Sequence, residues 1–579
     1  MKMKKLLSLL LASALSVSML ASCSSSNTDE EEIEEEEEED KGAIVEMYFG
    51  EKMPDDFDPT TFPTNADEYQ LTSILYEGLT GVDKNGKVYG LGASEWDYEI
   101  DELDGELKLL IKLKSTKWSD SIPVRADDYV FAWKKLLSPA NDNPAAMLLY
   151  PIKNAKKVKS GEVTVADIGA SALNNNTLEI VFENTEADVE YFLKCLASPM
   201  LVPLREDKVK HDKWSTQLDL LVTNGPFAIK SISEDRLIIE RSTHYNSLRT
   251  RQALDTYVKP YRLIVYYGDE AKAIEQYNSK DLATKYYFLG NLSKDSAQSF
   301  GSSVKYADEL ATYTYFFNTD NEVLASAETR KALSAALDRQ AIAEIRGAGA
   351  VAATGLVPNG VMEANSKKSF REAGGDLLAS VSGNVAKKGS VKITYNEDRA
   401  YEAEIAKLAR DAWKGLGVSV QLDPVPGDQI DDVIKSGEFD VIAADYIALT
   451  NDAYGFVTPF ALQFSGSYVD VTNPDVFYNP HFTGFESDEF NALIDEIYAT
   501  KSAKEKAPLL HKAEEMLLAE SPVAPLFYEK SNYVASKDLS KYEVTYRGTM
   551  DFRNMKLKGY KKVNEAKVAA EEAEEAAAK

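Results

Sequence analysis

Apolar and polar residues alternate along the chain in patterns that predict both strands and helices. Regular alternation over 105–113 is typical of a strand with one exposed face. A strand at 391–395, a helix at 400–413 and a returning strand at 417–422 predict a parallel βαβ unit. A later strand is expected at 440–444.

Helices are predicted where apolar residues recur every three or four positions. Acidic residues open the segment 127–137 and lysines close it, which suits the helix dipole. Another helix is expected at 68–79. The Ala-rich segment 328–346 predicts one continuous helix, with Leu333 and Leu337 one turn apart on the same face.

Two further segments have a distinct pattern. Residues 224–245 predict a β-hairpin, because two apolar runs flank a short polar turn. Residues 561–579 consist mostly of Ala, Glu and Lys, and we expect a frayed helix or a disordered tail there. The chain shows no internal repeat.

The first 23 residues have the pattern of an export signal. Lysines at positions 2, 4 and 5 precede an apolar run at 6–20, which is shorter than the roughly 20 residues of a membrane-spanning helix. The run ends in Leu20-Ala21-Ser22-Cys23, which resembles a bacterial lipobox, whose cysteine receives a lipid and becomes the new N-terminus. The alternative is an ordinary secretory peptide. We expect an exported protein, anchored on the extracytoplasmic face of the cell membrane through lipid on Cys23.

A strongly acidic segment follows the cysteine. Residues 24–41 contain eleven carboxylates, and such a run repels itself and buries no apolar surface. An unpatterned run of Glu also lacks the geometry that fixes a metal ion. We expect a solvated tether that carries the folded body away from the membrane.

Composition excludes some classes of function. The net charge is −29, so the protein is a poor partner for nucleic acid, whose binding requires Lys and Arg against phosphates. Mean hydropathy is −0.32 and no second long apolar stretch occurs, so the body is expected to be soluble. Cys23 and Cys195 are the two cysteines in the sequence. With Cys23 lipidated, no intrachain disulfide can form, and Cys195 is expected to be a buried small apolar residue.

The sequence offers little support for catalysis. Its four histidines are scattered, and HExxH, GxSxG and Walker A motifs do not occur. Ser302 and Lys305 fit the short SxxK pattern without its companion motifs. Zinc would need more converging His and Cys residues than the chain provides. We expect no cofactor, no metal and no enzymatic activity. The 31 tyrosines instead suit recognition of varied ligands.

Several ordered motifs resemble one known family, from about residue 42 to 558. It is the large solute-binding proteins of bacterial ABC importers, of the oligopeptide- and dipeptide-binding lipoprotein type, family 5. Ser121 stands where Gly is usual and Arg125 where Thr would cap a helix. The matching motifs are 75–79 (LYEGL), 117–129 with Trp133, 224–227 (NGPF), 318–319, 330–333, 338–339, Pro358, 483–485, 513–514 and 522–526.

The resemblance implies an architecture as well as a function. The fold would be periplasmic-binding-protein-like type II, with two hinged α/β lobes that close on a ligand and an extra lobe inserted near the N-terminus. Trp118 and Trp133 are expected in the core. The expected segments are a signal peptide at 1–22, an acidic tether at 23–42, lobe I at 43–82, 216–300 and 531–560, an inserted lobe II at 83–215, lobe III at 301–530 and the tail at 561–579.

The resemblance also suggests which residues contact a peptide. In the family a strand end supplies main-chain pairing, an aromatic wall and a carboxylate that holds the ligand amine. Here Ala444 and Tyr446 stand at the strand end, and Leu449 stands at the anchor position. Asp452 or Asp445 is therefore expected to replace the anchor. Asp452 would alternatively cap a helix over 453–460.

A second wall is expected around 65–69, with Glu68 as a further polar contact. The function implied is a monomeric receptor that captures short peptides and delivers them to a membrane permease driven by a cytoplasmic ATPase. Within the same fold, the ligand would alternatively be a nickel chelate, haem or an oligosaccharide. A secreted hydrolase is the alternative from another class.

Overall fold

An 11-stranded sheet forms the frame of the body. The computed structural model describes residues 40–60, 66–83, 86–141, 143–245, 258–363, 366, 368–464 and 481–578. The strands follow the order β15-β14-β16-β12-β17-β11-β1-β10-β9-β8, and β13 pairs with β17. Their bounds are β1 Ile44–Tyr48, β8 Phe227–Ile232, β9 Arg236–Arg241, β10 Arg262–Tyr266, β11 Phe288–Gly290, β12 Lys305–Phe317, β13 Val351–Ala352, β14 Gly389–Asn396, β15 Val418–Val425, β16 Val441–Ile447 and β17 Val523–Ala535.

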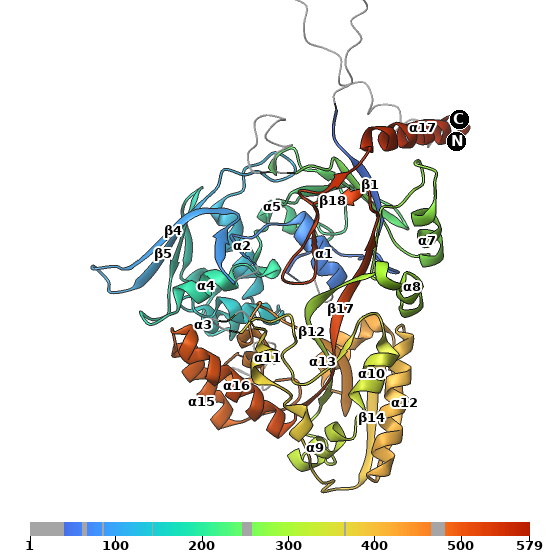
Figure 1. Cartoon of the computed structure of the whole chain (residues 1–579). Helices are drawn as coiled ribbons and strands as arrows, with labels where there is room; N and C mark the ends of the chain where they lie inside the picture. Colours follow the sequence, from blue (N-terminus) through green and yellow to red (C-terminus); the bar gives the residue numbers. More distant parts are fainter. Residues whose placement is uncertain are drawn as a thin grey trace, which may run out of the picture. The chain divides into compact units, whose positions relative to one another are not determined.

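Two long neighbouring strands, β12 and β17, connect the two halves of this sheet. The first part of β17 pairs with β12 beside β16, and its last residues pair with β11, where Phe288 faces Ala535. Figure 1 shows the two strands running together from the region of α1 (Ala66–Leu75) to the region of α10 (Arg339–Arg346) and α12 (Ala400–Gly415). A bend in these strands would move one half against the other.

The predicted βαβ unit is present. β14 and β15 pair in parallel, with Val391 opposite Val420, and α12 connects them. One face of α12 is buried against the sheet, and Trp413 Nε1 donates to the Leu333 carbonyl at 2.9 Å. The expected strand at 440–444 is also present, and extends to Ile447 as β16.

A separate four-stranded sheet lies in the segment predicted as the inserted lobe. Its order is β4-β5-β7-β6, with bounds Ala93–Ile100, Leu107–Leu113, Thr177–Val181 and Ala170–Asn174. β5 alternates between buried and exposed residues, as predicted. Helix α2 (Ala126–Leu136) covers the sheet, and Trp118 and Trp133 are fully buried in the core. Cys195 is buried as expected, at the end of α4 (Val189–Cys195).

The two departures from the family motif have visible structural consequences. Ser121 has φ +75, in the left-handed region that glycine adopts without strain. Arg125 stands at the N-cap of α2 without a side-chain cap. The Asp128 carboxylate in the first turn bonds back to the chain before the helix, because its Oδ2 accepts the Arg125 N–H at 2.9 Å and the Trp118 Nε1–H at 3.0 Å.

Two predicted helices have different limits in the structure. The helix expected at 68–79 is α1, which ends at Leu75 because Gly225 N donates to the Leu75 carbonyl at 2.9 Å. A Cβ on Gly225 would lie 2.6 Å from that carbonyl, so the close approach requires glycine. The Asn224 side chain then accepts the Glu77 N–H at 3.1 Å and draws the chain out of the helix.

The continuous helix predicted over 328–346 is wrong. The segment forms two helices, α9 (Ala327–Ala335) and α10. Asp338 caps α10, since its Oδ1 accepts the Ala341 N–H at 3.0 Å. A capped start competes with helix continuation, and it separates Leu333 from Leu337.

The tail predicted to be frayed or disordered is the helix α17 (Tyr560–Ala578), and it docks on β1. Val563 is buried, and Asn564 bonds to the backbone of Gly42 and Ile44. These contacts supply the order that the composition alone does not predict. The remaining helices that bear on the site are α8 Lys294–Ser299, α13 Ile430–Ser436, α14 Tyr454–Val457, α15 Asp488–Ala499 and α16 Ala503–Glu520.

Candidate functional site

The carboxyl end of β16 has one open edge. On one side β16 pairs with β12 along its whole length, from Val441 to Ile447. On the other side β14 pairs only with Val441 and Ile442. Among the residues that the structure describes, no strand occupies this edge from Ala443 to Ile447. Three predicted site residues, Ala444, Asp445 and Tyr446, lie on this stretch. An extended peptide can add to such an edge through main-chain hydrogen bonds.

Asp445, in the same strand end, is paired with an arginine. Arg399 Nη1 lies 2.9 Å from Asp445 Oδ2 and 3.3 Å from Glu402 Oε1. The pairing follows from topology, because β14 and β16 are parallel and Arg399 directly precedes α12 at the edge where β16 ends. The carboxylate predicted as a candidate anchor is therefore already neutralised by a guanidinium of the chain.

Further charged groups surround this pair. Arg346 Nε lies 3.1 Å from Glu529 Oε1, and its guanidinium stacks over the Tyr401 ring at 4.8 Å. Glu402 is 2% exposed, and burial raises its pKa to about 7, with the Arg399 charge opposing that rise. A layer of two arginines and three carboxylates thus lies at the carboxyl end of β16.

Tyr446 packs into an aromatic cluster. Its hydroxyl donates to the Phe456 carbonyl at 2.8 Å, and its ring is edge-on to Phe316, Phe456 and Phe460. Burial raises the pKa of the phenol well above its usual range. The side chain is half-buried, and the hydrogen bond fixes its orientation beside the open edge.

Asp452 is held by four groups of the chain itself. Lys194 Nζ lies 3.2 Å from Oδ2, and Oδ1 accepts from the Thr450 hydroxyl at 2.8 Å, the Tyr191 hydroxyl at 3.1 Å and Gly455 N at 3.3 Å. The last contact is to the first turn of α14, which together with the 3-10 helix Thr458–Phe460 that follows it nearly covers the helix expected over 453–460. Burial acts to raise the pKa of Asp452, but the Lys194 charge and these hydrogen bonds hold it below its usual value.

The loop after β16 is bridged to the opposite half of the body by Arg547. The guanidinium donates to the carbonyl oxygens of Ala448 at 3.1 Å and Leu449 at 3.0 Å. It also lies over the ring of Tyr69 at 5.1 Å. Glu68, the predicted polar contact, precedes Tyr69 in α1 and is half-buried. Arg547 therefore connects α1 to the loop that follows the open strand edge.

A cavity of about 580 Å³ opens beside this bridge. Tyr69 and Arg547 line it together with Glu77, Asp551 and Arg553. Burial raises the pKa of Glu77, which accepts a hydrogen bond from the Tyr245 hydroxyl. Arg553 binds both oxygens of Asp551, at 2.9 and 2.6 Å to Oδ2 and 3.0 Å to Oδ1. The cavity has room for a small ligand and is lined by fixed polar groups.

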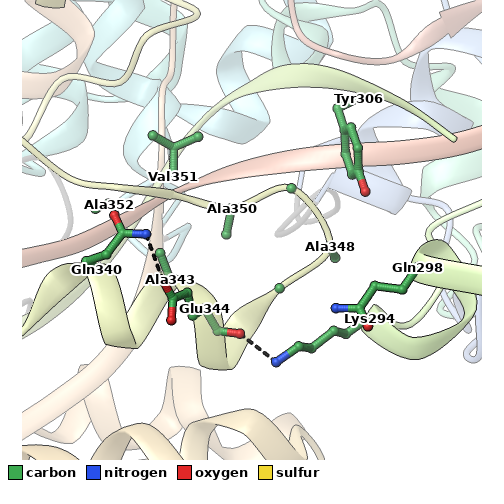
Figure 2. A pocket seen from close by; sticks show the side chains of 12 residues that line it. Lys294, Gln298, Tyr306, Gln340, Ala343, Glu344, Ala348, Ala350, Val351 and Ala352 are labelled. Carbon is green, nitrogen blue, oxygen red and sulfur yellow. Dashed lines mark hydrogen bonds between the residues drawn. The ribbon is translucent and has the colours of Figure 1, made fainter. Parts of the chain in front are cut away.

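A second cavity, of about 550 Å³, lies between α8 and α10 beside β12 (Figure 2). Lys294 Nζ crosses it to the Glu344 carbonyl at 2.6 Å, and Tyr306 of β12 stands on its wall. A Cβ on Gly349 would lie 2.2 Å from the Tyr306 ring, so the loop after α10 approaches this strand closely. These contacts are made where β12 joins the two halves of the sheet.

Some predictions fall on other parts of the chain. Cys23, the signal segment and most of the acidic tether lie outside the described residues, as does residue 65 of the second wall. Within the described ranges, no group of three His, Cys, Asp or Glu side chains is arranged to hold a metal ion. None of the helices among these residues is both long and apolar enough to cross a bilayer. The predicted segment boundaries stay a prediction.

Sequence reasoning missed the basic residues of this region. Arg399 lies 46 residues from its partner Asp445, Arg547 lies 98 residues from Leu449, and Lys194 lies 258 residues from Asp452. No local pattern marks such partners. The excess of carboxylates was the one available signal. A carboxylate that is buried by folding requires a nearby cation to compensate its charge.

Comparison with known proteins gives a consistent result. The oligopeptide-binding protein OppA of Bacillus subtilis is 27% identical over 504 residues, covering 83% of this chain and 87% of that protein. The dipeptide-binding protein DppE of the same organism is 26% identical, covering 91% and 94%. The structure of Listeria monocytogenes OppA bound to peptide superposes with a TM-score of 0.71 at 20% identity, covering 89% and 99%.

These matches decide the fold and the family. The structural likeness confirms the predicted type II fold of two hinged α/β lobes with an inserted lobe. The relatives are named as binding proteins. Residues 87–468 match the family described as bacterial extracellular solute-binding proteins, family 5 Middle. The chain belongs to the family 5 solute-binding proteins of bacterial ABC importers.

Proposed function

We propose that this protein captures short peptides outside the cell and delivers them to a membrane permease driven by a cytoplasmic ATPase. The names of its relatives support a peptide ligand, since they are oligopeptide- and dipeptide-binding proteins. The observation that carries the proposal is the open edge of β16 from Ala443 to Ile447, next to the loop that Arg547 holds.

The ligand main chain would lie extended along this edge. Pairing with the backbone of Ala444, Asp445 and Tyr446 would bind any peptide sequence, because every residue except proline offers the same donor and acceptor. Glu68 would contact the ligand from α1. Asp452 would act through the loop that it stabilises, since Lys194 already neutralises its carboxylate.

Binding would be coupled to a rearrangement of the lobes. β12 and β17 connect the two halves, and Arg547 joins them across the site. A peptide that contacts both halves would favour the closed form, and the permease would recognise that form, which is a shift of population without covalent chemistry. We further propose that the protein is monomeric and that lipid on Cys23 keeps it at the extracytoplasmic face of the membrane.

Main-chain recognition is tested with peptides that carry one N-methyl group at successive positions. N-methylation removes a backbone donor and leaves the side chain unchanged. We expect affinity, measured by calorimetry, to fall by about tenfold at alternate positions, because a paired strand uses alternate N–H groups on one side. A flat profile across all positions would exclude pairing along β16.

Native mass spectrometry of freshly purified protein tests the class of ligand. A mixture of copurified peptides supports the proposal. One defined mass that matches a nickel chelate, haem or an oligosaccharide would replace peptides by that ligand within the same fold. Turnover of a substrate without retained ligand would favour an enzyme.

A further inference from the structure

Helix α4, in the segment predicted as lobe II, makes an ion pair with the loop that follows β16. Lys194 Nζ lies 3.2 Å from Asp452 Oδ2, and the two side chains are only 22% and 13% exposed. Tyr191, one turn earlier, donates its hydroxyl to Asp452 Oδ1 at 3.1 Å and stacks edge-on against Tyr454. Two successive turns of α4 therefore contact one carboxylate.

A second ion pair lies beside the first. Its carboxylate stands at the start of α4 and its lysine on α16, so the charges are placed the other way round. Lys506 of α16 is 3.2 Å from Asp188 Oδ2, and these side chains are 11% and 17% exposed. Asp188 also caps α4, because its Oδ1 accepts the Tyr191 N–H at 3.0 Å. Lys506 Nζ lies over the Tyr191 ring at 4.9 Å. Tyr191 is thus held between Lys506 and Tyr454.

These pairs differ from ordinary surface ion pairs. An exposed ion pair contributes little to stability, because water screens the attraction between the charges and the long side chains lose conformational entropy. Here each cation has a partner on the other lobe and little exposure, and Lys506 also lies over the Tyr191 ring. Lys501 and Glu186, also 3.2 Å apart, add an exposed pair at the rim of the same contact. Loss of one partner in a partly buried pair leaves the other charge without compensation.

We propose that Asp188, Tyr191, Lys194, Asp452 and Lys506 form a latch between the inserted lobe and lobe III that sets the lifetime of the bound ligand. The proposal rests on the proposed function. The latch fixes the loop 448–453, whose first two carbonyls bind Arg547 and which directly follows the open edge of β16. Lys194 and Lys506 are positioning residues, since they act on the ligand through this loop.

The test compares Lys194→Met/Lys506→Met with the wild-type full-length chain. Ligands are drawn from a mixed library of synthetic tri- to pentapeptides, and rates are measured for a member that binds. We expect the dissociation rate to rise by about tenfold, with the association rate within about twofold of wild type. Hydrogen–deuterium exchange across residues 448–457 should become faster, with or without peptide.

Two variants serve as controls. Lys108→Met removes a cation of similar exposure, 19%, that pairs with Asp101 and Asp104 inside the inserted lobe. It should leave the dissociation rate and exchange across 448–457 unchanged. Lys194→Arg/Lys506→Arg keeps both ion pairs and should give wild-type values, which loss of packing alone would not explain.

The outcomes separate the latch from the proposed function. An unchanged dissociation rate and unchanged exchange across 448–457 in the double variant would overturn the latch. Failure of the wild-type chain to bind any peptide would overturn the proposed function. In that case, unchanged exchange across 448–457 would still reject the latch, and faster exchange would still support the positioning of this loop by α4.

Discussion

Lys567 Nζ lies 3.0 Å from Glu46 Oε1, and this ion pair joins α17 to β1. The side chains are 3% and 8% exposed, and Lys567 Nζ also donates to the Ala283 carbonyl at 3.1 Å. Burial raises the pKa of Glu46, and the nearby ammonium opposes that rise. Helix α17 is therefore fixed to the sheet by the Lys567 ammonium, which compensates the charge of the buried Glu46 carboxylate in β1.

The first prediction concerns this pair. In Lys567→Met the carboxylate of Glu46 stays buried without its cation, so we expect the free energy of unfolding to fall by about 3 kcal/mol. Urea unfolding followed by circular dichroism measures the change. Lys562→Met, at an exposed position of the same helix, should change stability by less than about 0.5 kcal/mol. Equal stabilities of the two variants would show that α17 contributes nothing through this pair.

A second prediction concerns the left-handed residue in the turn before α2. Ser121 has φ +75, and a side chain in this region costs about 1 kcal/mol relative to glycine. Ser121→Gly should therefore raise the stability of the protein by up to about that amount, less the larger entropy of glycine in the unfolded chain. Thermal unfolding measures it. Ser121→Ala keeps the strain and should give no increase, so a gain in Ala as large as in Gly would contradict this explanation.

The sequence predicted those parts of the fold in which neighbouring residues determine the structure. The βαβ unit at 389–425 follows from periodicity, and the burial of Trp118 and Trp133 was expected from the family resemblance. The break between α9 and α10 was missed because Asp338 is one of several polar residues in an Ala-rich segment, and nothing in the pattern distinguishes it from the others. From the sequence alone, an aspartate that caps a helix cannot be distinguished from one that faces solvent in the middle of a helix.

The candidate site could be predicted only in part, for the same reason. The strand end with Ala444 and Tyr446 lies in the apolar pattern that predicts β16. The partners of its acids lie outside that pattern, since Arg399 directly precedes α12 and Lys194 belongs to α4. The family resemblance suggested Asp452 as the anchor for the ligand amine. Tertiary contacts decide whether its carboxylate pairs with a ligand amine or with a lysine of the chain, and here Lys194 lies beside it.

A third prediction follows from the buried Glu402, whose pKa is raised from 4.5 to about 7. Between these two values the folded state holds a proton that the unfolded state has released. This contribution to stability is present at low pH and is lost as the pH rises through about 7. The loss is on the order of 3 kcal/mol, from the size of the shift.

Glu402→Gln tests this prediction because glutamine imitates the protonated acid. The variant should match the wild type near pH 5 and exceed it in stability near pH 8, in urea unfolding at both values. Glutamine retains an oxygen that can accept the Asn396 N–H, which Glu402 accepts at 2.9 Å. A difference between variant and wild type that does not depend on pH would mean that Glu402 stays ionised over the whole range.

The last prediction distinguishes two roles for Asp452. If its carboxylate holds the amine of a peptide, Asp452→Asn should weaken binding of free peptides more than of their N-acetylated forms, because only the free forms carry the cation. The structure instead surrounds this carboxylate with Lys194, Tyr191 and Thr450. We therefore expect the substitution to reduce affinity for both forms by the same factor, about tenfold, through loosening of the loop. Calorimetry on matched peptide pairs measures the ratio, with Asp411→Asn on the exposed face of α12 as the control. A loss confined to free peptides would assign Asp452 to the ligand, and it would require Lys194 to move away when a peptide binds.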